Sequence, residues 1–216
     1  MLNHKGFDLW AGDYDRSVGL SDDMGTYPFA GYKDVLNEIY NRVLSRPGKA
    51  VLDIGFGTGT LTAKLYEKGY DIYGQDFSGK MIEIAHEKMP DAQLFQGDFL
   101  AGLVRELTQN KYDSIIATYA LHHLTDAGKV EFLNRLLGLL NDGGRIYIGD
   151  IAFASRRDME ACQRQSGDEW DDDEIYFVYD ELKEHFPQMN FEQMSYCAGV
   201  FELRRADSQN GSSDTL

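Results

Sequence analysis

Three glycines that follow an apolar run are the strongest chemical signal in this sequence. Ala50–Ile54 has the length and composition of a buried strand, and Gly55, Gly57 and Gly59 come directly after it. Glycine permits the tight turn, and the close approach of a ligand to the backbone, that larger residues prevent. A strand that enters such a turn and continues into a helix is typical of nucleoside-binding α/β proteins. The loop therefore predicts a ligand that resembles a nucleoside.

The spacing of these glycines separates two classes of ligand. The dinucleotide-binding pattern has its third glycine one position later than Gly59, where this chain has Thr60. Asp53 lies two residues before the first glycine, where its carboxylate would attract an ammonium group and repel a pyrophosphate. A ligand with a cationic head is therefore favoured over NAD.

Candidate ribose and adenine contacts follow the next two expected strands. Asp76 ends the second strand, and its carboxylate can accept two hydrogen bonds from a ribose diol. Phe77 and Met81 offer an apolar wall for one face of an adenine ring. After the third strand, Asp98 can accept a hydrogen bond from the adenine amino group, and Phe99 offers a backbone amide and apolar surface. Each residue alone is equally well explained as a helix cap or a core aromatic, but three such signals occur in order.

Polar and aromatic side chains also follow the fourth expected strand, at the end where ligands bind in open α/β sheets. Thr118 ends this strand and is expected beside the ligand, and Tyr119 either contacts a cationic ligand or simply packs. His122 and His123 are candidate general bases, since imidazole titrates near neutral pH, or they hold the loop by hydrogen bonds. Asp150, after the fifth strand, either orients an acceptor or caps the following helix.

These residues are positioned by an alternation of short apolar runs and helical stretches, which is typical of βαβ units and a mainly parallel sheet. A helix with one apolar stripe is expected first, at Tyr32–Leu44. The strands expected after it are Ala50–Ile54, Asp71–Asp76, Ala92–Gln96, Asp113–Thr118 and Gly144–Asp150. The helices expected between these strands are Thr58–Lys68, Gly79–Lys88, Leu100–Gln109 and Ala127–Leu140.

The C-terminal part breaks this alternation. Helical stretches at Ser155–Gln165 and Tyr179–His185 flank an acidic run, Asp168–Glu174. Asn190–Tyr196 and Val200–Arg205 follow, and the link between them is too short for a crossover helix, so they are expected to pair antiparallel. The predicted fold class is therefore α/β, a mostly parallel seven-stranded sheet with an antiparallel C-terminal hairpin and helices on both faces.

Three segments are expected along the chain. Residues 1–31 contain Trp10, Tyr14 and several glycines and aspartates, which suits a lid over the ligand, with Tyr14 as a candidate ligand contact. An amphipathic helix is the alternative there. Residues 32–205 are expected to form the ligand-binding domain. Residues 206–216 are expected to be disordered because they carry almost no apolar side chain.

The composition disfavours several classes of function. Among 216 residues, 36 Asp and Glu stand against 21 Lys and Arg, a formal net charge of −15, so nucleic acid is a poor partner. The chain shows neither an apolar run of membrane-spanning length nor the apolar stretch of a signal peptide, so a cytoplasmic protein is expected. Cys162 and Cys197 have no CxxC spacing, and no run of His, Asp and Glu has ligand spacing, so no metal is expected.

Taken together, these segments resemble the motifs of the class I S-adenosylmethionine-dependent methyltransferases. Val51–Gly59 resembles the first motif of that family, Ile72–Ser78 the second and Gly97–Phe99 the third. Phe7–Asp15 and Ala120–Leu124 are similar to methyltransferases of the quinone C-methylating type and to the YrrT-like bacterial group. The resemblance implies a Rossmann-like sheet of five parallel strands, a sixth strand and an antiparallel seventh.

The resemblance also implies S-adenosylmethionine as the cofactor and S-adenosylhomocysteine as the product. It assigns Asp53 and the three glycines of the loop to the methionine part of the cofactor. It assigns Asp76 to the ribose hydroxyls, and Asp98 and Phe99 to the adenine. Phe56 stands where Cys or Ala is common in the family, at a position that tolerates change.

The expected function is methyl transfer to a small-molecule acceptor by in-line displacement, in a monomer or homodimer that works without membrane, nucleic acid or metal. Positioning and exclusion of water supply much of such catalysis, so no catalytic side chain is obligatory. A regulatory protein that binds the cofactor without transferring its methyl group is the alternative. A nicotinamide-dependent oxidoreductase is a second alternative, which the glycine spacing disfavours.

Overall fold

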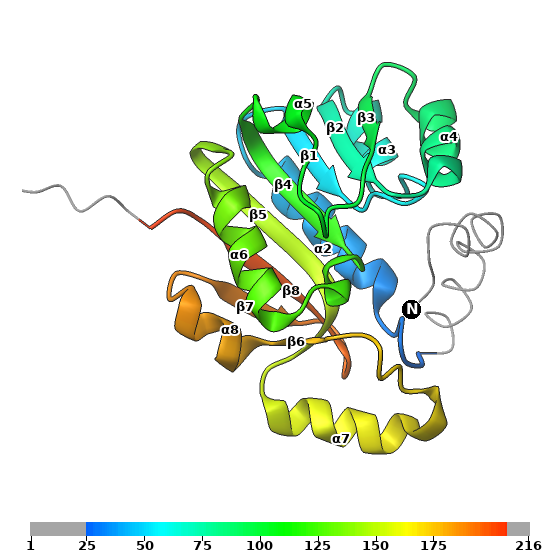
Figure 1. The fold of residues 1–216 in the computed structure, drawn as a ribbon, viewed down its shortest axis with the longest axis vertical. Coiled ribbons are helices and arrows are strands. Elements are labelled where there is room, and N and C mark those ends of the chain that lie inside the picture. The colour runs from blue at the N-terminus through cyan, green and yellow to red at the C-terminus, as the bar shows by residue number, and fades with distance from the viewer. Residues whose placement is uncertain (1–24, 207–216) are drawn as a thin grey trace, which may run out of the picture.

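The computed structural model describes residues 25–206, which form one layered α/β unit (Figure 1). The strands are β1 (Ala50–Ile54), β2 (Asp71–Asp76), β3 (Gln93–Gln96), β4 (Tyr112–Thr118), β5 (Leu140–Phe153), β6 (Phe177–Val178), β7 (Asn190–Gln193) and β8 (Ala198–Leu203). The helices are α2 (Tyr32–Leu44), α3 (Thr62–Glu67), α4 (Gly79–Lys88), α5 (Arg105–Thr108), α6 (Asp126–Leu137), α7 (Arg156–Ser166) and α8 (Tyr179–His185). Two 3-10 turns complete the elements, η1 (Leu121–His123) and η2 (Gly167–Glu169).

The order of the strands creates the place where a ligand binds. The sheet runs β3-β2-β1-β4-β5-β8-β7, and β6 pairs with β5 outside this path. Strands β1 to β5 are parallel, whereas β8 is antiparallel to both of its neighbours. The chain leaves β1 toward β2 and β3 and then returns to β4 on the other side of β1. In open α/β sheets, ligands bind outside the carboxyl ends of the strands at such a reversal.

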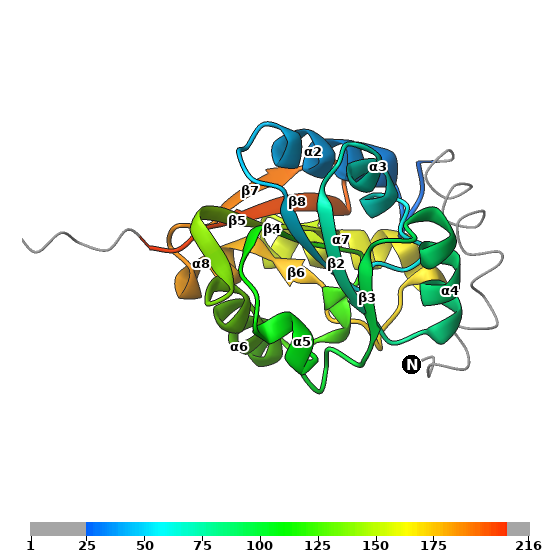
Figure 2. The ribbon, with the colours of Figure 1, turned by 90° about the horizontal axis from the view of Figure 1, so that it is seen from above.

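Helices cover both faces of the sheet (Figure 2). On one face, α2, α3 and α4 bury Ile39, Leu65 and Ala85 in one apolar cluster. On the other face, α6 and α8 bury Leu133 and Leu182 in a second cluster. Because both faces are covered, the central strands are apolar almost throughout, which explains why they were visible as apolar runs in the sequence.

The predicted fold class is confirmed, and several elements have the predicted bounds. The first two strands and the helices Tyr32–Leu44, Gly79–Lys88 and Tyr179–His185 match the predictions residue for residue. The C-terminal pairing is antiparallel as expected. Strand β6 was not predicted, because two residues are too few to show a period.

Other boundaries were predicted wrongly, and each has a local reason. Helix α3 begins at Thr62 instead of Thr58, because the glycine turn extends over residues 55–61. Helix α5 keeps only four residues of the expected Leu100–Gln109, and the Gln75 side chain accepts the amide of Val104 before it begins.

Strand β5 is longer than expected, and helix α6 correspondingly ends earlier. The chain leaves the helix at Leu137, and the predicted end of the helix at Leu140 is already strand. Strand β5 then continues past Asp150 because Ile151 pairs with β8 and Phe153 pairs with β6.

Two predicted segments lie largely outside the described residues. Residues 1–24, with Trp10 and Tyr14, belong to the expected lid, and residues 207–216 belong to the expected disordered tail. Within residues 25–206, no helix combines the length and the apolar character needed to cross a membrane.

Helix α2 packs against β5 at Gly149. A Cβ atom at this position would lie 2.3 Å from Cγ1 of Val35 and 2.8 Å from Cδ1 of Ile39. Both of these side chains are fully buried, so neither has room to move aside. Only glycine therefore fits at this position while α2 keeps its place on the sheet.

Gly149→Ala is expected to lower the free energy of unfolding by about 1–3 kcal/mol, because the added methyl group overpacks the contact between α2 and β5. Denaturant unfolding followed by circular dichroism measures the change. Gly79→Ala is the matched control, since its Cβ would lie no closer than 3.5 Å to Gln96 and should leave stability nearly unchanged. Combining Gly149→Ala with Val35→Ala should cost less than the sum of the two single changes. Equal stability of Gly149→Ala and the parent would contradict this packing.

Candidate functional site

A pocket opens at the carboxyl ends of β1, β2 and β4. Polar and apolar side chains line it together, as they do in small-molecule and cofactor sites. Most of the residues predicted from the sequence to bind or to react line it together: Asp53, Gly55, Gly57, Asp76, Phe77, Met81, Phe99, Thr118, Tyr119 and His123. The pocket lining does not include Gly59, Asp98 or His122. Tyr14 lies outside the described residues.

The three glycines of the turn serve different purposes. All have positive φ angles, of 69°, 56° and 74° in chain order, which favour glycine. A Cβ at Gly55 would lie 2.6 Å from Cβ of Ala120, and one at Gly59 would lie 2.8 Å from Cε of Met89. A Cβ at Gly57 would meet no atom within 4 Å. Gly57 is therefore the glycine whose backbone is open to a ligand, whereas Gly59 serves helix packing.

Asp53 is buried in the wall of the pocket. The side chain of Thr62 donates a hydrogen bond to Oδ2 of Asp53, while Oδ1 has no hydrogen-bond partner. Burial, together with the nearby charge of Asp76, raises the pKa of Asp53 to about 7 despite the opposing hydrogen bond from Thr62. A cationic group at Oδ1 would favour the charged form of this carboxylate.

Asp76 is held in a single orientation at the end of β2. Its Oδ2 accepts a hydrogen bond of 2.8 Å from the amide of Gly57, and its Oδ1 accepts one of 2.9 Å from the amide of Ser78. Each carboxylate oxygen has more than one acceptor site, so the group can still receive hydroxyl donors from a ligand. Ser78 in turn caps α4 by accepting the amide of Met81 at 3.2 Å.

The residues after β3 divide between the pocket and the surface. Phe99 and Met81 are buried side chains that line the pocket and supply its apolar wall. Asp98 is exposed, and its Oδ1 accepts the amide of Leu100 at 2.8 Å. Asp98 therefore stabilises the turn that follows β3 and is not a helix cap, since Val104 is the N-cap residue of the next helix, α5.

Tyr119 forms an aromatic wall on the β4 side of the pocket. It has a positive φ of 50°, which is uncommon for a residue other than glycine and occurs preferentially at functional sites. Its ring centroid lies 5.0 Å from that of Tyr32 and 5.5 Å from that of Phe29. The described end of the N-terminal segment thus packs against the loop that follows β4.

The two adjacent histidines have different surroundings. His122 is buried, with its Nδ1 2.6 Å from Oδ1 of Asp150 and its Nε2 3.4 Å from Oε1 of Glu174. Burial alone would lower the pKa of His122, but the carboxylates of Asp150 and Glu174 outweigh it and raise the pKa. His123 lines the pocket, and burial together with the charge of His122 lowers its pKa to about 4. His123 is therefore the neutral imidazole that faces the ligand space.

Asp150 neither orients an acceptor in the pocket nor caps α7. It is fully buried and accepts the amides of Leu121 and Ile151 in addition to its contact with His122. The cap of α7 is Ser155, whose side chain accepts the amide of Asp158. The buried carboxylate thus holds both the imidazole of His122 and the backbone of the loop that carries it.

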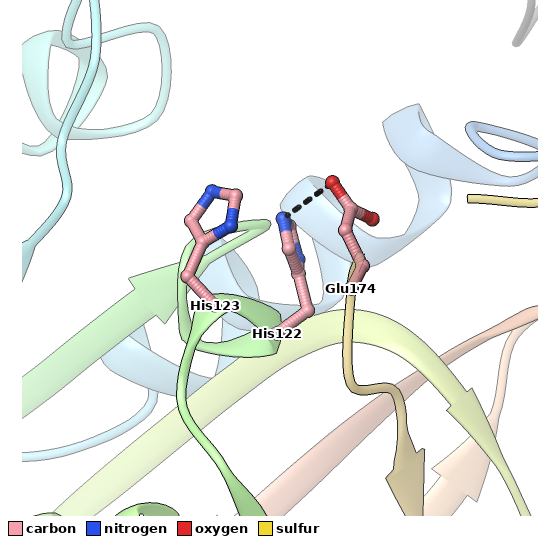
Figure 3. Close-up of side chains that lie close together, drawn as sticks. All are labelled: His122, His123 and Glu174. Atoms are coloured by element: carbon pink, nitrogen blue, oxygen red, sulfur yellow. Dashed lines mark ion pairs between the residues drawn. The ribbon is translucent and has the colours of Figure 1, made fainter. Parts of the chain in front are cut away.

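Glu174 is the site residue that sequence analysis missed. It comes from the acidic run Asp168–Glu174, and nothing in the spacing of that run distinguished one carboxylate from the others. The amide of Ile175 donates a hydrogen bond of 2.8 Å to the carbonyl of His122, which brings the two segments together. Figure 3 shows His122 between His123 and Glu174.

Comparison with known proteins gives a family for the whole arrangement. A family model described as a methyltransferase domain matches residues 51–144. An uncharacterised methyltransferase from Geobacillus thermodenitrificans (strain NG80-2) is 37% identical over 193 residues, which cover 86% of this chain and 86% of that protein.

Two solved structures share the fold. The complex of DhpI with SAH has a TM-score of 0.66 at 16% identity and covers 95% of this chain and 96% of DhpI. The magnesium protoporphyrin IX methyltransferase of Synechocystis PCC 6803 with bound SAH has a TM-score of 0.63 at 19% identity and covers 82% of this chain and 85% of that enzyme. At these identities the likeness shows the fold. The family model, the Geobacillus relative and the fold together confirm the resemblance, and this chain belongs to the class I S-adenosylmethionine-dependent methyltransferases.

Proposed function

We propose that this methyltransferase binds S-adenosylmethionine in the pocket at the ends of β1, β2 and β4 and transfers the methyl group to a small-molecule acceptor beside Tyr119 and His123. The observation that carries the cofactor site is the buried carboxylate of Asp53, whose Oδ1 has no partner in the protein. Leaving such an atom unpaired costs free energy, so its position in a pocket wall favours a ligand that donates to it.

The remaining groups of the pocket fit the rest of the cofactor in order. The ammonium of the methionine part suits Oδ1 of Asp53, and the open backbone at Gly57 leaves room for the chain that follows it. The ribose hydroxyls suit the carboxylate of Asp76, whose orientation two amides hold. The buried side chains of Met81 and Phe99 suit the faces of the adenine. Asp98 contributes indirectly, by holding the turn that presents Phe99.

The acceptor is proposed to enter on the side of Tyr119. When bound, S-adenosylmethionine supplies an electrophilic methyl group that a nucleophile displaces from the sulfonium, which leaves S-adenosylhomocysteine. The packed rings of Phe29, Tyr32 and Tyr119 exclude water from this side of the pocket. The neutral imidazole of His123 can accept a hydrogen bond from the acceptor and orient its nucleophilic atom, while Asp150 and His122 support the loop.

Two observations favour a small molecule as the acceptor. The pocket is a concave site in which a few polar groups converge among apolar side chains, as in small-ligand sites, and the net charge of −15 opposes nucleic acid. The magnesium protoporphyrin IX methyltransferase that shares this fold is named for a small-molecule substrate.

As pH increases toward about 7, the affinity for S-adenosylmethionine is expected to rise about tenfold per pH unit. Above about pH 7 the affinity is expected to level off. The pKa of Asp53 in the free protein is about 7, and an ammonium at Oδ1 lowers it, so binding at lower pH must release a proton. Calorimetry in buffers of different ionisation enthalpy measures both the affinity and the released proton. Asp53→Asn should bind more weakly and lose the pH dependence. A slope in Asp53→Asn equal to that of the parent would show that another group titrates.

Asp76→Ala is expected to weaken S-adenosylmethionine binding by about 1.5–3 kcal/mol, because two charge-assisted hydrogen bonds to the ribose are lost. Calorimetry measures the affinity, and circular dichroism shows whether the variant is folded. Asp71→Ala is the matched control, since this exposed residue begins the same strand and should leave affinity unchanged. An unaltered affinity in folded Asp76→Ala would remove this residue from the site.

Turnover is the test of the acceptor class. Incubation with S-adenosylmethionine and fractionated small metabolites should generate S-adenosylhomocysteine above the rate seen without an acceptor, and Asp76→Ala should lower that rate. Folded protein and nucleic acid, offered separately, should generate none above background. Product formed only with a macromolecular fraction would contradict the proposed acceptor class.

A further inference from the structure

Three potential metal ligands gather on the acceptor side of the pocket. His122 and His123 belong to η1, whereas Glu174 belongs to the segment that follows η2. Each offers one ligand atom, and these atoms lie within 4.8 Å of one another. Figure 3 shows the two imidazoles and the carboxylate side by side above the end of β5. Spacing along the chain did not indicate this cluster, because Glu174 is distant from the histidines in sequence.

We propose that His122, His123 and Glu174 bind a divalent transition-metal ion of the zinc class next to the acceptor space. Two imidazoles and one carboxylate form a donor set that holds zinc in enzymes, where a fourth position stays open for water or substrate. Binding of the ion by these side chains does not depend on the cofactor site. What the ion does there rests on the proposed function.

The distances suit a small ion. Nε2 of His122 lies 3.4 Å from Oε1 of Glu174. Two ligand atoms that each lie about 2.0–2.2 Å from a tetrahedral zinc ion are roughly 3.4 Å apart, so this pair already has ligand spacing. Since no two of the three ligand atoms are more than 4.8 Å apart, His123 has to approach by about 1.4 Å at most to complete the set, which a side-chain rotation supplies.

A second carboxylate, that of Asp150, contacts the other ring nitrogen of His122. Nδ1 of His122 lies 2.6 Å from Oδ1 of Asp150, which is fully buried and also accepts two backbone amides. Histidines that bind metal almost always donate their other ring N–H to a carboxylate, a carbonyl or water, which orients the ring and strengthens the ligand. Asp150 thus directs Nε2 of His122 toward Glu174 before any ion binds.

The charges around the cluster favour a cation. Glu174 and Asp150 flank His122, and Asp98 and Asp171 add negative potential at His123. Lys129 is the opposing charge, but its ammonium donates to Asp126 and to the carbonyl of Ile175. The negative groups therefore exceed the positive one, as a divalent ion requires.

An ion at this place would occupy the one acceptor nitrogen of neutral His123 and would itself activate the acceptor, in place of the hydrogen bond to His123. His123 lines the pocket, so the ion lies next to the acceptor space. A bound divalent ion lowers the pKa of a coordinated O–H or S–H group, whose proton passes to solvent. The resulting anion then attacks the methyl carbon, and the electron pair of the breaking C–S bond stays on the sulfur of the cofactor. The acceptor class implied is an alcohol or a thiol.

Cobalt and zinc titration of the full chain tests this site. After treatment with a chelator, the protein should bind one equivalent of Co²⁺ with the visible absorption of a four- or five-coordinate site, and Zn²⁺ should displace it. His123→Ala and Glu174→Gln should each weaken Zn²⁺ binding at least tenfold. Asp150→Asn should weaken it by about 10–100-fold, as for other carboxylates that support a ligating histidine. His86→Ala and Glu160→Gln, exposed residues outside the cluster, are the matched controls and should bind as the parent does.

The outcomes separate the metal site from the cofactor site. Absence of the cobalt spectrum in the parent, or equal Zn²⁺ affinity in folded His123→Ala, Glu174→Gln and parent, would overturn the metal site. Calorimetry with S-adenosylmethionine on the chelator-treated parent tests the proposed function independently, since Asp53 and Asp76 need no metal. Failure there would contradict the cofactor site while leaving the metal result standing.

Discussion

The close contact between the turn after β1 and the loop after β4 is the constraint on which the site depends. The two strands are neighbours, but the chain leaves β1 in one direction along the sheet and returns to β4 from the other. Their carboxyl ends therefore emerge together, so near to one another that a Cβ at Gly55 would lie 2.6 Å from Cβ of Ala120. A glycine on one side and an alanine on the other let these two loops approach each other closely.

The pocket contains two buried carboxylates, Asp53 and Asp76. Asp53 and Asp76 both line the pocket, and burial together with the charge of Asp76 raises the pKa of Asp53 to about 7. A cationic ligand beside Asp53 would favour the charged form of this carboxylate. The same principle recurs on the acceptor side, where Asp150 and Glu174 surround the imidazole of His122.

The segment after α7 connects the sheet, the N-terminal part and the acceptor loop. Tyr27 stacks on Trp170 with ring centroids 5.4 Å apart, and its hydroxyl hydrogen-bonds that of Tyr176. From the same stretch, Ile175 joins the carbonyl of His122, and the short strand β6 continues the edge of β5. The residues that close the acceptor side therefore depend on contacts between three distant parts of the chain, whereas the cofactor side is built from consecutive βα units.

This difference explains what the sequence by itself determined. The central strands, the glycine turn and the helices Tyr32–Leu44 and Gly79–Lys88 were predictable because each depends on side-chain periodicity and on backbone freedom within a few residues. The gathering of residues from β1, β2 and β4 in one pocket was also predictable, since βα units place successive strand ends at one edge of the sheet. Tertiary structure alone decided that Asp53 is buried against Thr62, that Asp150 holds His122 and that Glu174 joins them. The burial of a side chain, its pKa and its distance from a ligand depend on segments that tertiary packing brings together. No local sequence pattern predicts which of several carboxylates will pack against His122.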